Sequence, residues 1–397
     1  MTAMPSRTTN PLSDPARRSP VLPAVLLALA LIAAGCGEGG GFFDGDGGSE
    51  PAITTEPNLV VAEEPYAWVR VAGSAGLFAD GESYRLEQED ISASSLGYVV
   101  VGYEIEQYPD TGVSRNDGCR IWYSADGFSW EMLGYTGTSG KNWMHSVVAG
   151  GQGFVAAGET SLGEADAAIW TSQTGTGWTQ AWTTPGDFDQ QVNAVAAGGP
   201  GFVAVGETYP GEAAVWISRD GTTWEQITDD AFRGAGDLEM YDVVAAGPGL
   251  VAVGLEETAD GYDGVVWTSR DGRSWTRVED PDGVFAGPGS QQIRHVVAGG
   301  PGLVAVGVEE YASEVVWTSP DGLTWTREPP GSIVFRGPNG AFTAIAVGPS
   351  GPAAFWDGSI WLALPCSASD DEIAALAGTA GGEIDDSACA AERARGG

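Results

Sequence analysis

Two adjacent positions that recur about every fifty residues carry the side chains best suited to chemistry. The residues around them hardly change between repeats, whereas these two positions vary. The first holds Glu89, His145, Asn193, Tyr241, Arg294 and Phe342, and the second holds Asp90, Ser146, Ala194, Asp242, His295 and Thr343. Carboxyl, imidazole, amide, phenol and guanidinium groups bind polar ligands and exchange protons. Our candidate ligand-binding set is Glu89, His145, Asn193, Tyr241, Asp242, Arg294 and His295, and the competing interpretation is that these positions are merely solvated.

The repeats that position these residues share a tryptophan block. Five segments follow the pattern Ile/Val-Trp-x-Ser-x-x-Gly-x-x-Trp, and their second Trp stands at 130, 178, 224, 275 and 325, a spacing of 46 to 51 residues. A Gly-bounded apolar run such as GFVAVG (201–206) precedes each block. A further short apolar run precedes the Gly-bounded run, and the two variable positions lie near the start of this further run. Each unit therefore predicts four short strands, with the last two joined by a tight turn.

A unit of four strands with a period near fifty residues is typical of a β-propeller, because one such sheet cannot bury both of its faces alone. The stretch at 65–72 resembles a fourth strand without the other three, and residues 342–365 supply three strands without a fourth. We therefore predict an all-β protein, a six-bladed propeller over residues 65–365. Its last blade is closed by the N-terminal strand as outer edge, and a tail with short helices follows at 366–397.

The four blocks with Ser-x-Asp-Gly-x-x-Trp resemble, in shortened form, the Asp-box (BNR) repeats of sialidase-like propellers. Their aspartates are Asp126, Asp220, Asp271 and Asp321, and Thr174 replaces Asp in the second repeat. The resemblance covers about 300 residues and implies a structural role in which Asp accepts backbone N–H bonds within the turn. The repeated Trp would pack between blades.

The same resemblance raises an enzymatic alternative to binding. Sialidases hold a carboxylate with three arginines and use a Tyr–Glu pair with an Asp, and Tyr241, Glu89 and Asp242 could take those roles. Arg233, Arg294 and Arg336 are the arginines on this face. Because the family's Phe/Tyr-Arg-Ile-Pro motif is absent, we favour a binding or interaction module for a glycan, cell-wall fragment or protein. A scaffold without a small ligand is the third interpretation.

Charge and motif content exclude some partners. The chain has 54 acidic and 18 basic residues, a net charge of −36, so it lacks the basic surface that nucleic acid requires. Glutamates that follow the second strand of each repeat would form an acidic rim, or simply serve solubility. We predict no cofactor and no metal site; oxygen ligands would suit Ca²⁺, but no calcium-loop motif is present. We expect a monomer.

The N-terminal residues predict export. A basic start, an apolar run at 21–34 and Ala33-Ala34-Gly35-Cys36 resemble the signal peptide (1–35) and lipobox of bacterial lipoproteins. Cys36 would carry the lipid, and residues 36–64, rich in Gly and acids, would be a tether. The protein would then be anchored by lipid to the outer face of the bacterial cell membrane. Of the remaining cysteines, Cys366 pairs with either Cys389 or Cys119 in an oxidising compartment, and spacing does not decide between them.

Overall fold

The computed structural model describes residues 66–70, 84–108, 113–134, 141–151, 153–161, 165–184, 189–287, 289–299, 302–309, 313–328, 344–348, 351–356, 359–365 and 384–385. The predicted signal peptide, Cys36, the tether, Arg336, Phe342, Thr343, Cys366 and Cys389 lie outside these residues.

Five sheets have the same construction: four antiparallel strands that follow one another in the chain. The strands of the first two sheets are β2 (Tyr84–Ser94), β3 (Gly97–Tyr108), β4 (Val113–Ser124), β5 (Glu131–Gly134), β6 (Lys141–Gly150), β7 (Gly153–Ser161), β8 (Ala165–Ser172) and β9 (Thr179–Thr183). Those of the third and fourth are β10 (Gln190–Gly198), β11 (Gly201–Thr208), β12 (Glu212–Ser218), β13 (Glu225–Ile227), β14 (Leu238–Val244), β15 (Leu250–Thr258), β16 (Gly261–Ser269) and β17 (Trp275–Arg277). The fifth consists of β18 (Gln291–Gly299), β19 (Gly302–Glu309), β20 (Ser313–Ser319) and β21 (Thr326–Arg327).

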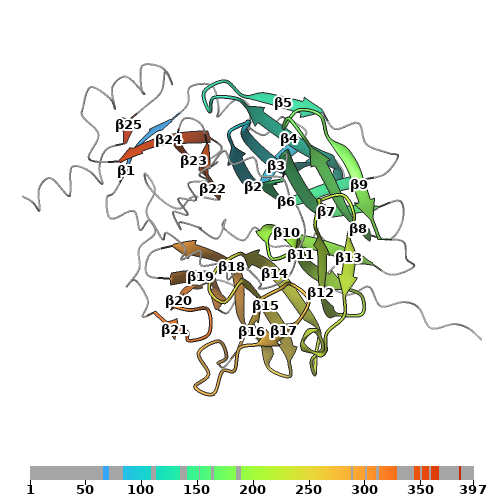
Figure 1. Cartoon of the computed structure of the whole chain (residues 1–397), viewed down its shortest axis with the longest axis vertical. Helices are drawn as coiled ribbons and strands as arrows, with labels where there is room; N and C mark the ends of the chain where they lie inside the picture. The colour runs from blue at the N-terminus through green and yellow to red at the C-terminus, as the bar shows by residue number, and fades with distance from the viewer. Residues whose placement is uncertain are drawn as a thin grey trace, which may run out of the picture.

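The sheets are arranged as in a propeller (Figure 1). Their first strands, β2, β6, β10, β14 and β18, contact one another in succession, and the short fourth strands lie at the outside. The protein is thus nearly all β, as predicted. A 3₁₀ turn, Asp230–Phe232, is a helical element between β13 and β14.

A further sheet joins the two ends of the chain. It has the order β22 (Ala344–Gly348), β23 (Gly351–Trp356), β24 (Ser359–Pro365), β1 (Tyr66–Arg70) and β25 (Ile384–Asp385). The antiparallel pairing of β1 with β24, from Tyr66 opposite Pro365 to Arg70 opposite Trp361, is as predicted. The prediction that β1 is the outer edge is wrong, because β25 pairs with its other side.

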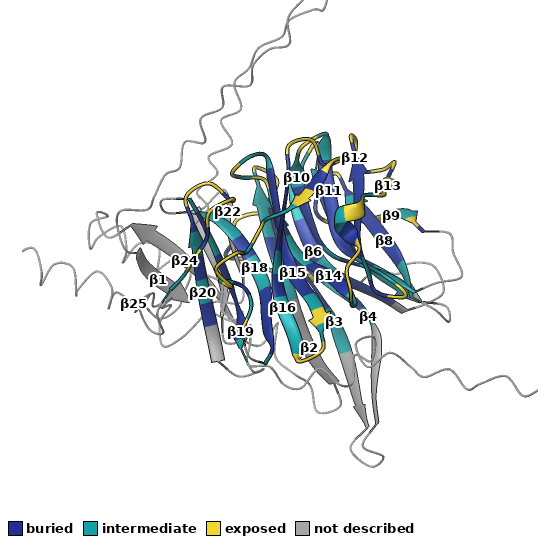
Figure 2. Ribbon diagram, turned by 90° about the horizontal axis from the view of Figure 1, so that it is seen from below, coloured by how far each residue is buried: buried dark blue, intermediate teal, exposed yellow. Residues whose placement is uncertain are grey.

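The core lies between neighbouring sheets. One buried cluster combines Val205 and Val215 of the third sheet with Leu238, Ala252 and Trp267 of the fourth. The first Trp of every block is fully buried, namely Trp122, Trp170, Trp216, Trp267 and Trp317. The second, third and fourth sheets have such a cluster on both faces, and their central strands are mostly buried (Figure 2).

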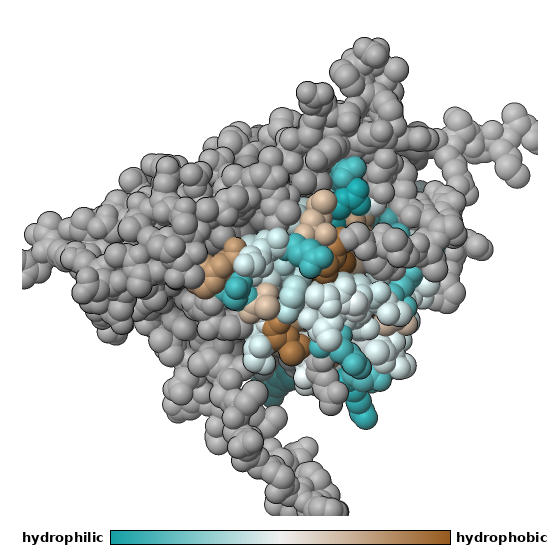
Figure 3. All heavy atoms as spheres, turned by 90° about the horizontal axis from the view of Figure 1, so that it is seen from above, coloured by the Kyte–Doolittle hydropathy of each residue, from teal (hydrophilic) through white to brown (hydrophobic). Residues whose placement is uncertain are grey.

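The outer surface offers little apolar area. Four large hydrophobic side chains are exposed among the described residues, and they are scattered: Leu96, Met132, Tyr209 and Leu323. From above, hydrophilic and hydrophobic residues intermingle where the described part is visible (Figure 3). Single exposed hydrophobic residues of this kind are normal for a soluble surface.

Candidate functional site

Each of the five described first strands contains a β-bulge, and the extra residue is the one that the sequence singles out. The register shifts between Gln88 and Asp90 in β2, and at the equivalent place in the other four sheets. The inserted residues are Glu89, His145, Asn193, Tyr241 and Arg294. A bulge interrupts the regular alternation of side chains along the strand and changes the direction in which the inserted side chain points. All five are half-buried, next to neighbours in the same strand such as Met144 and Val192 that are buried completely.

Glycines of the neighbouring second strand make room for the bulges. Gly158, Gly206, Gly254 and Gly307 stand opposite the residue just before the bulge. A Cβ at any of them would collide with the backbone carbonyl two positions before the bulged residue, such as that of Glu239 for Gly254. This close approach explains why the apolar run of each repeat ends in glycine.

Arg294 of β18 lies against Tyr241 of the neighbouring first strand, β14. Its guanidinium carbon is 5.2 Å from the centre of the Tyr241 ring, a cation–π distance. Its Nη2 donates to Gln292 Oε1 at 2.6 Å, while its buried Nε has no hydrogen-bond partner among the described residues. The structure therefore brings two predicted site residues together, and the guanidinium Nε of Arg294 is buried without a hydrogen bond to the described residues.

Asn193 forms a second polar group with residues of the adjacent sheet. Its Nδ2 donates to Glu239 Oε1 at 3.0 Å and to the Met240 carbonyl at 2.9 Å, and its Oδ1 accepts from Gln191 Nε2. The candidate set derived from the sequence does not include Gln191, Glu239 and Gln292. All three stand two residues before a bulged residue, and that common offset is the signal that could have identified them.

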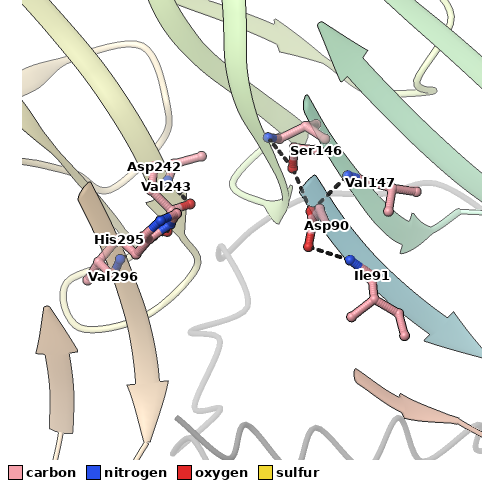
Figure 4. A network of polar contacts seen from close by, with 9 residues as sticks. Asp90, Ile91, Ser146, Val147, Asp242, Val243, His295 and Val296 are labelled. Carbon is pink, nitrogen blue, oxygen red and sulfur yellow. Dashed lines mark hydrogen bonds and ion pairs between the residues drawn. The ribbon is translucent and has the colours of Figure 1, made fainter. Parts of the chain in front are cut away.

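The second variable position links neighbouring sheets (Figure 4). Asp90 Oδ2 accepts from Ser146 Oγ at 2.9 Å and from the Val147 N–H at 2.8 Å, both in the next sheet. Asp242 Oδ2 accepts from the Val296 N–H at 2.9 Å in the same way. Both carboxylates therefore help to hold the first strands together.

Burial perturbs these two carboxyl groups. It raises the pKa of Asp90 to about 6 and the pKa of Asp242 to about 7. Hydrogen bonds from backbone N–H groups favour the charged form and lower both pKa values, but their effect is smaller than that of burial. The charge of Glu89 also raises the pKa of Asp90, and the charge of Asp90 raises the pKa of Asp242. The two carboxyl groups thus influence each other electrostatically although they belong to the first and fourth sheets.

Both histidines lie close to carboxylates. His145 Nε2 is 4.0 Å from Glu159 Oε1, and His295 Nδ1 is 3.9 Å from Asp242 Oδ2. Tyr103 contacts the His145 ring edge to face. These are longer than hydrogen bonds, so the imidazoles lie beside the acids without a direct bond to them.

The enzymatic assignment gains no support from the geometry. Asp242 uses one oxygen for the Val243 N–H and the other for Val296. Arg233 is paired with Glu212 at 3.0 Å and Asp230 at 3.6 Å, and its side chain is half exposed. Arg233 is thus paired with residues of β12 and of the 3₁₀ turn, and Arg336 is outside the described residues.

The structure differs from the predicted acidic rim. The glutamates lie within the second strands, which extend further than the sequence suggested, and three of them are paired with arginine. These pairs are Glu104 with Arg120, Glu256 with Arg277 and Glu309 with Arg327, at 2.6 to 3.0 Å. At these three positions the acids are therefore locally neutralised.

The Ser-x-Asp-Gly turns lie away from the site and are held by their own side chains. Asp271 Oδ1 accepts from the N–H groups of Arg273 and Ser274, Ser269 Oγ accepts from Gly272, and Trp275 Nε1 donates to the Gly272 carbonyl. The same hydrogen bonds recur around Asp126, Asp220 and Asp321. In the second repeat, Thr174 Oγ1 accepts a longer bond, 3.4 Å, from Thr176.

No group of three or more His, Cys, Asp or Glu residues suited to a metal occurs in the described part of the chain. A search of those same residues finds no helix with the length and apolar character to cross a bilayer.

Cys119 is a free, buried thiol, so the pairing of Cys119 with Cys366 is not formed. Burial raises its pKa to about 12, which makes it unreactive.

No protein-family model matches the chain, and no curated protein is significantly similar in sequence. Solved structures that superpose on it include a glycosyl hydrolase from Bacteroides ovatus, with 12% identity over 58% of this chain and 84% of that one and a TM-score of 0.35. The fucoside-binding Aleuria aurantia lectin, as a mutant in complex with Fucα1-6GlcNAc, has 12% identity over 64% and 81%, with a TM-score of 0.38. A family 117 glycoside hydrolase of the marine bacterium Zobellia galactanivorans has 10% identity over 54% and 75%, with a TM-score of 0.35. Superpositions this loose carry no conclusion about a shared ligand or activity.

Proposed function

We propose that the protein is a six-bladed propeller, with the sheet that contains β1 as sixth blade, and that it binds a glycan, cell-wall fragment or protein through the face formed by the bulged residues. The observation that carries this proposal is the row of five bulges. Each bulge presents a chemically different, half-buried side chain on an otherwise repeated scaffold. A fold that only needed rigidity could use the same residue in every sheet.

The composition of the face suits recognition. Tyr and Arg are the residues that most often dominate binding energy, and Arg294 and Tyr241 are already packed together. Amide and carboxyl groups around them supply both donors and acceptors. A few polar groups held in fixed positions are what determines the orientation of a small ligand.

The N-terminal sequence supports the further proposal that the protein is exported, lipidated on Cys36 and held at the outer face of the bacterial membrane as a monomer. Metabolic labelling with a radioactive fatty acid tests it. We expect label on the wild-type chain and none on Cys36→Ser, which should leave the detergent phase. A labelled Cys36→Ser variant would contradict the anchor.

A binding screen tests the function. The full-length chain in detergent is applied to arrays of glycans and peptidoglycan fragments, together with Tyr241→Ala and the control Leu323→Ala, which alters an exposed side chain in an outer turn. Truncation of a buried hot-spot aromatic weakens binding by about 30-fold or more, so we expect retention by wild type and control but not by Tyr241→Ala. Retention of no ligand would favour the scaffold interpretation. Turnover of a fluorogenic sialoside that disappears in Tyr241→Phe would favour the enzymatic one.

A further inference from the structure

Backbone N–H groups of the first strands need acceptors that their own sheets do not supply. Each first strand is the edge of its four-stranded sheet, so alternate N–H groups point away from the hydrogen-bonded ladder. A buried N–H without an acceptor is costly. In all five described first strands, a side chain accepts from the residue two positions after the bulged one, and that residue is at most 6% exposed: Ile91, Val147, Val195, Val243 and Val296.

Three side chains at the second variable position accept from all five of these N–H groups. Asp90 accepts from Ile91 in its own strand and from Val147 in the next sheet, at 2.7 and 2.8 Å. Ser146 Oγ accepts from Val195 of the sheet after it, at 3.2 Å. A side chain at this position therefore serves the following sheet, and a carboxylate also serves its own strand.

Asp242 serves two N–H groups because the sheet before it offers no acceptor at this position. Ala194 occupies the second variable position of β10 and has no polar side-chain atom for the N–H of Val243. Asp242 Oδ1 accepts from Val243 at 2.7 Å, and its Oδ2 accepts from Val296 of β18 at 2.9 Å (Figure 4). Both carboxylate oxygens thus have donors within the fold.

The residues beside this link are the stacked pair of the binding face. Tyr241 directly precedes Asp242, and Arg294, two residues before Val296, has its guanidinium carbon 5.2 Å from the centre of the Tyr241 ring. We propose that Asp242 is a positioning residue, whose carboxylate holds β18 against β14 and so keeps Arg294 over Tyr241. This rests on the proposed function, because it specifies how two binding side chains are held. Asp242 acts through them and not on the ligand.

The neighbouring histidine does not supply this link. His295 Nδ1 is 3.9 Å from Asp242 Oδ2, which is longer than a hydrogen bond. Burial, together with the charge of Arg294, lowers the pKa of His295 to about 4, so the imidazole is neutral at pH 7 and forms no ion pair. At this level the N–H of Val296, and not the imidazole, is bonded to Asp242.

Tyrosine nitration of the full-length chain in detergent tests the positioning role without a ligand. Tetranitromethane modifies exposed phenols, and Tyr209, at 48% exposure, is the internal reference. At about pH 8.5, where Asp242 is charged, Asp242→Ala should increase the nitration rate of Tyr241 about 10-fold relative to Tyr209, as expected for the loss of one buried hydrogen bond. Peptide mass spectrometry measures both rates.

Asp242→Ser separates the hydrogen bond from the charge. The hydroxyl can accept from Val296 as Ser146 accepts from Val195, while the negative charge beside Tyr241 is removed in this variant as it is in Asp242→Ala. We therefore expect nitration of Tyr241 at the wild-type rate. A rate as high as that of Asp242→Ala would mean that charge, and not the link between the strands, controls the reaction.

Amide hydrogen exchange checks which acceptor serves which N–H group. In Asp242→Ser the N–H of Val296 should stay protected, whereas the N–H of Val243 should lose protection about 10-fold. Ala194→Ser places a hydroxyl where Ser146 stands one sheet earlier. The double variant Ala194→Ser/Asp242→Ser should therefore restore protection at Val243, and unchanged exchange there would contradict the assignment of acceptors.

Asp90→Ala is the matched control, because it removes the equivalent carboxylate from the link between β2 and β6 and should leave nitration of Tyr241 unchanged. Unchanged nitration in Asp242→Ala, or an equal increase in Asp90→Ala, would overturn the positioning role. Thermal melts establish which variants fold. If Asp242→Ala does not fold, lost protection of Val296 or faster nitration of Tyr241 in Asp242→Ser would overturn the role instead. Since no ligand takes part, either result leaves the proposed function intact, and that function fails separately if the binding screen retains no ligand.

Discussion

At the scale of single residues, the chain separates side chains that hold the scaffold from side chains that vary on it. The turn aspartates each accept two backbone N–H bonds, and those bonds lower the pKa of Asp271 and Asp321. The bulged residues instead differ from sheet to sheet. The sequence alone identifies both sets, because repetition marks the first and variation within repetition marks the second.

The second repeat tests the turn chemistry, because Thr174 occupies the place of the aspartate. Thr174→Asp should shorten the bond accepted from the Thr176 N–H, add a bond from the Gly177 N–H, and raise the free energy of unfolding by about 1 kcal/mol at pH 7. Since the carboxylate is stabilised in the folded state, the gain should be lost as the pH falls below about 4. Urea unfolding at both pH values measures it. The converse variant Asp271→Thr should be destabilised by a similar amount, and a stable Asp271→Thr would contradict the role of the carboxylate.

Asp90 and Asp242 predict the opposite pH dependence. Their folded pKa values, about 6 and about 7, exceed the ordinary value of 3.8, so the folded state binds protons more tightly than the unfolded state. Stability should therefore fall as the pH rises from about 4 to about 7. Asp242→Ser retains an acceptor, as Ser146 does for the Val195 N–H, and removes one titrating group. Its unfolding midpoint should depend less on pH than that of the wild type, and an unchanged slope between pH 5 and pH 8 would refute this assignment.

At the scale of elements, the bulge determines where the variable residues lie. The hydrophobic pattern indicates which segments are strands and in what order, and the pairing of β1 with β24 follows from counting incomplete units. The bulges themselves could not be predicted, because an inserted residue changes register without changing composition. The glycines that recur in the second strand of each repeat, opposite the bulges, are the sequence feature that accompanies the bulges. The extent of β7, β11 and β15 was also underestimated, since Glu and Thr at strand ends resemble loop residues there.

A substitution at one of these glycines tests the pairing. Gly254→Ala would press a Cβ against the Glu239 carbonyl and should cost about 1–3 kcal/mol of stability, as overpacked cores do. Gly177→Ala is the control, because the space around that position is open. Chemical denaturation of both proteins measures the difference. Equal stability would mean that the bulge does not require glycine opposite it.

At the scale of the whole molecule, the buried core lies between neighbouring sheets, and one sheet joins strands from the two ends of the chain. Deletion of residues 66–70 removes β1 from between β24 and β25 and exposes an unpaired edge. We expect aggregation or a loss of cooperative unfolding, measured by light scattering and calorimetry. Wild-type melting of the deletion variant would show that the pairing of β1 does not stabilise the fold.

The central claim is that ligands bind on the face of the bulged residues. Amide hydrogen exchange of the full-length chain, with and without a saturating ligand from the binding screen, tests it most directly. Ligand-dependent protection should concentrate in the first strands around the bulged residues, and the turns at 124–130, 218–224 and 269–275 should exchange as before. Protection confined to those turns, with the first strands unchanged, would contradict the account.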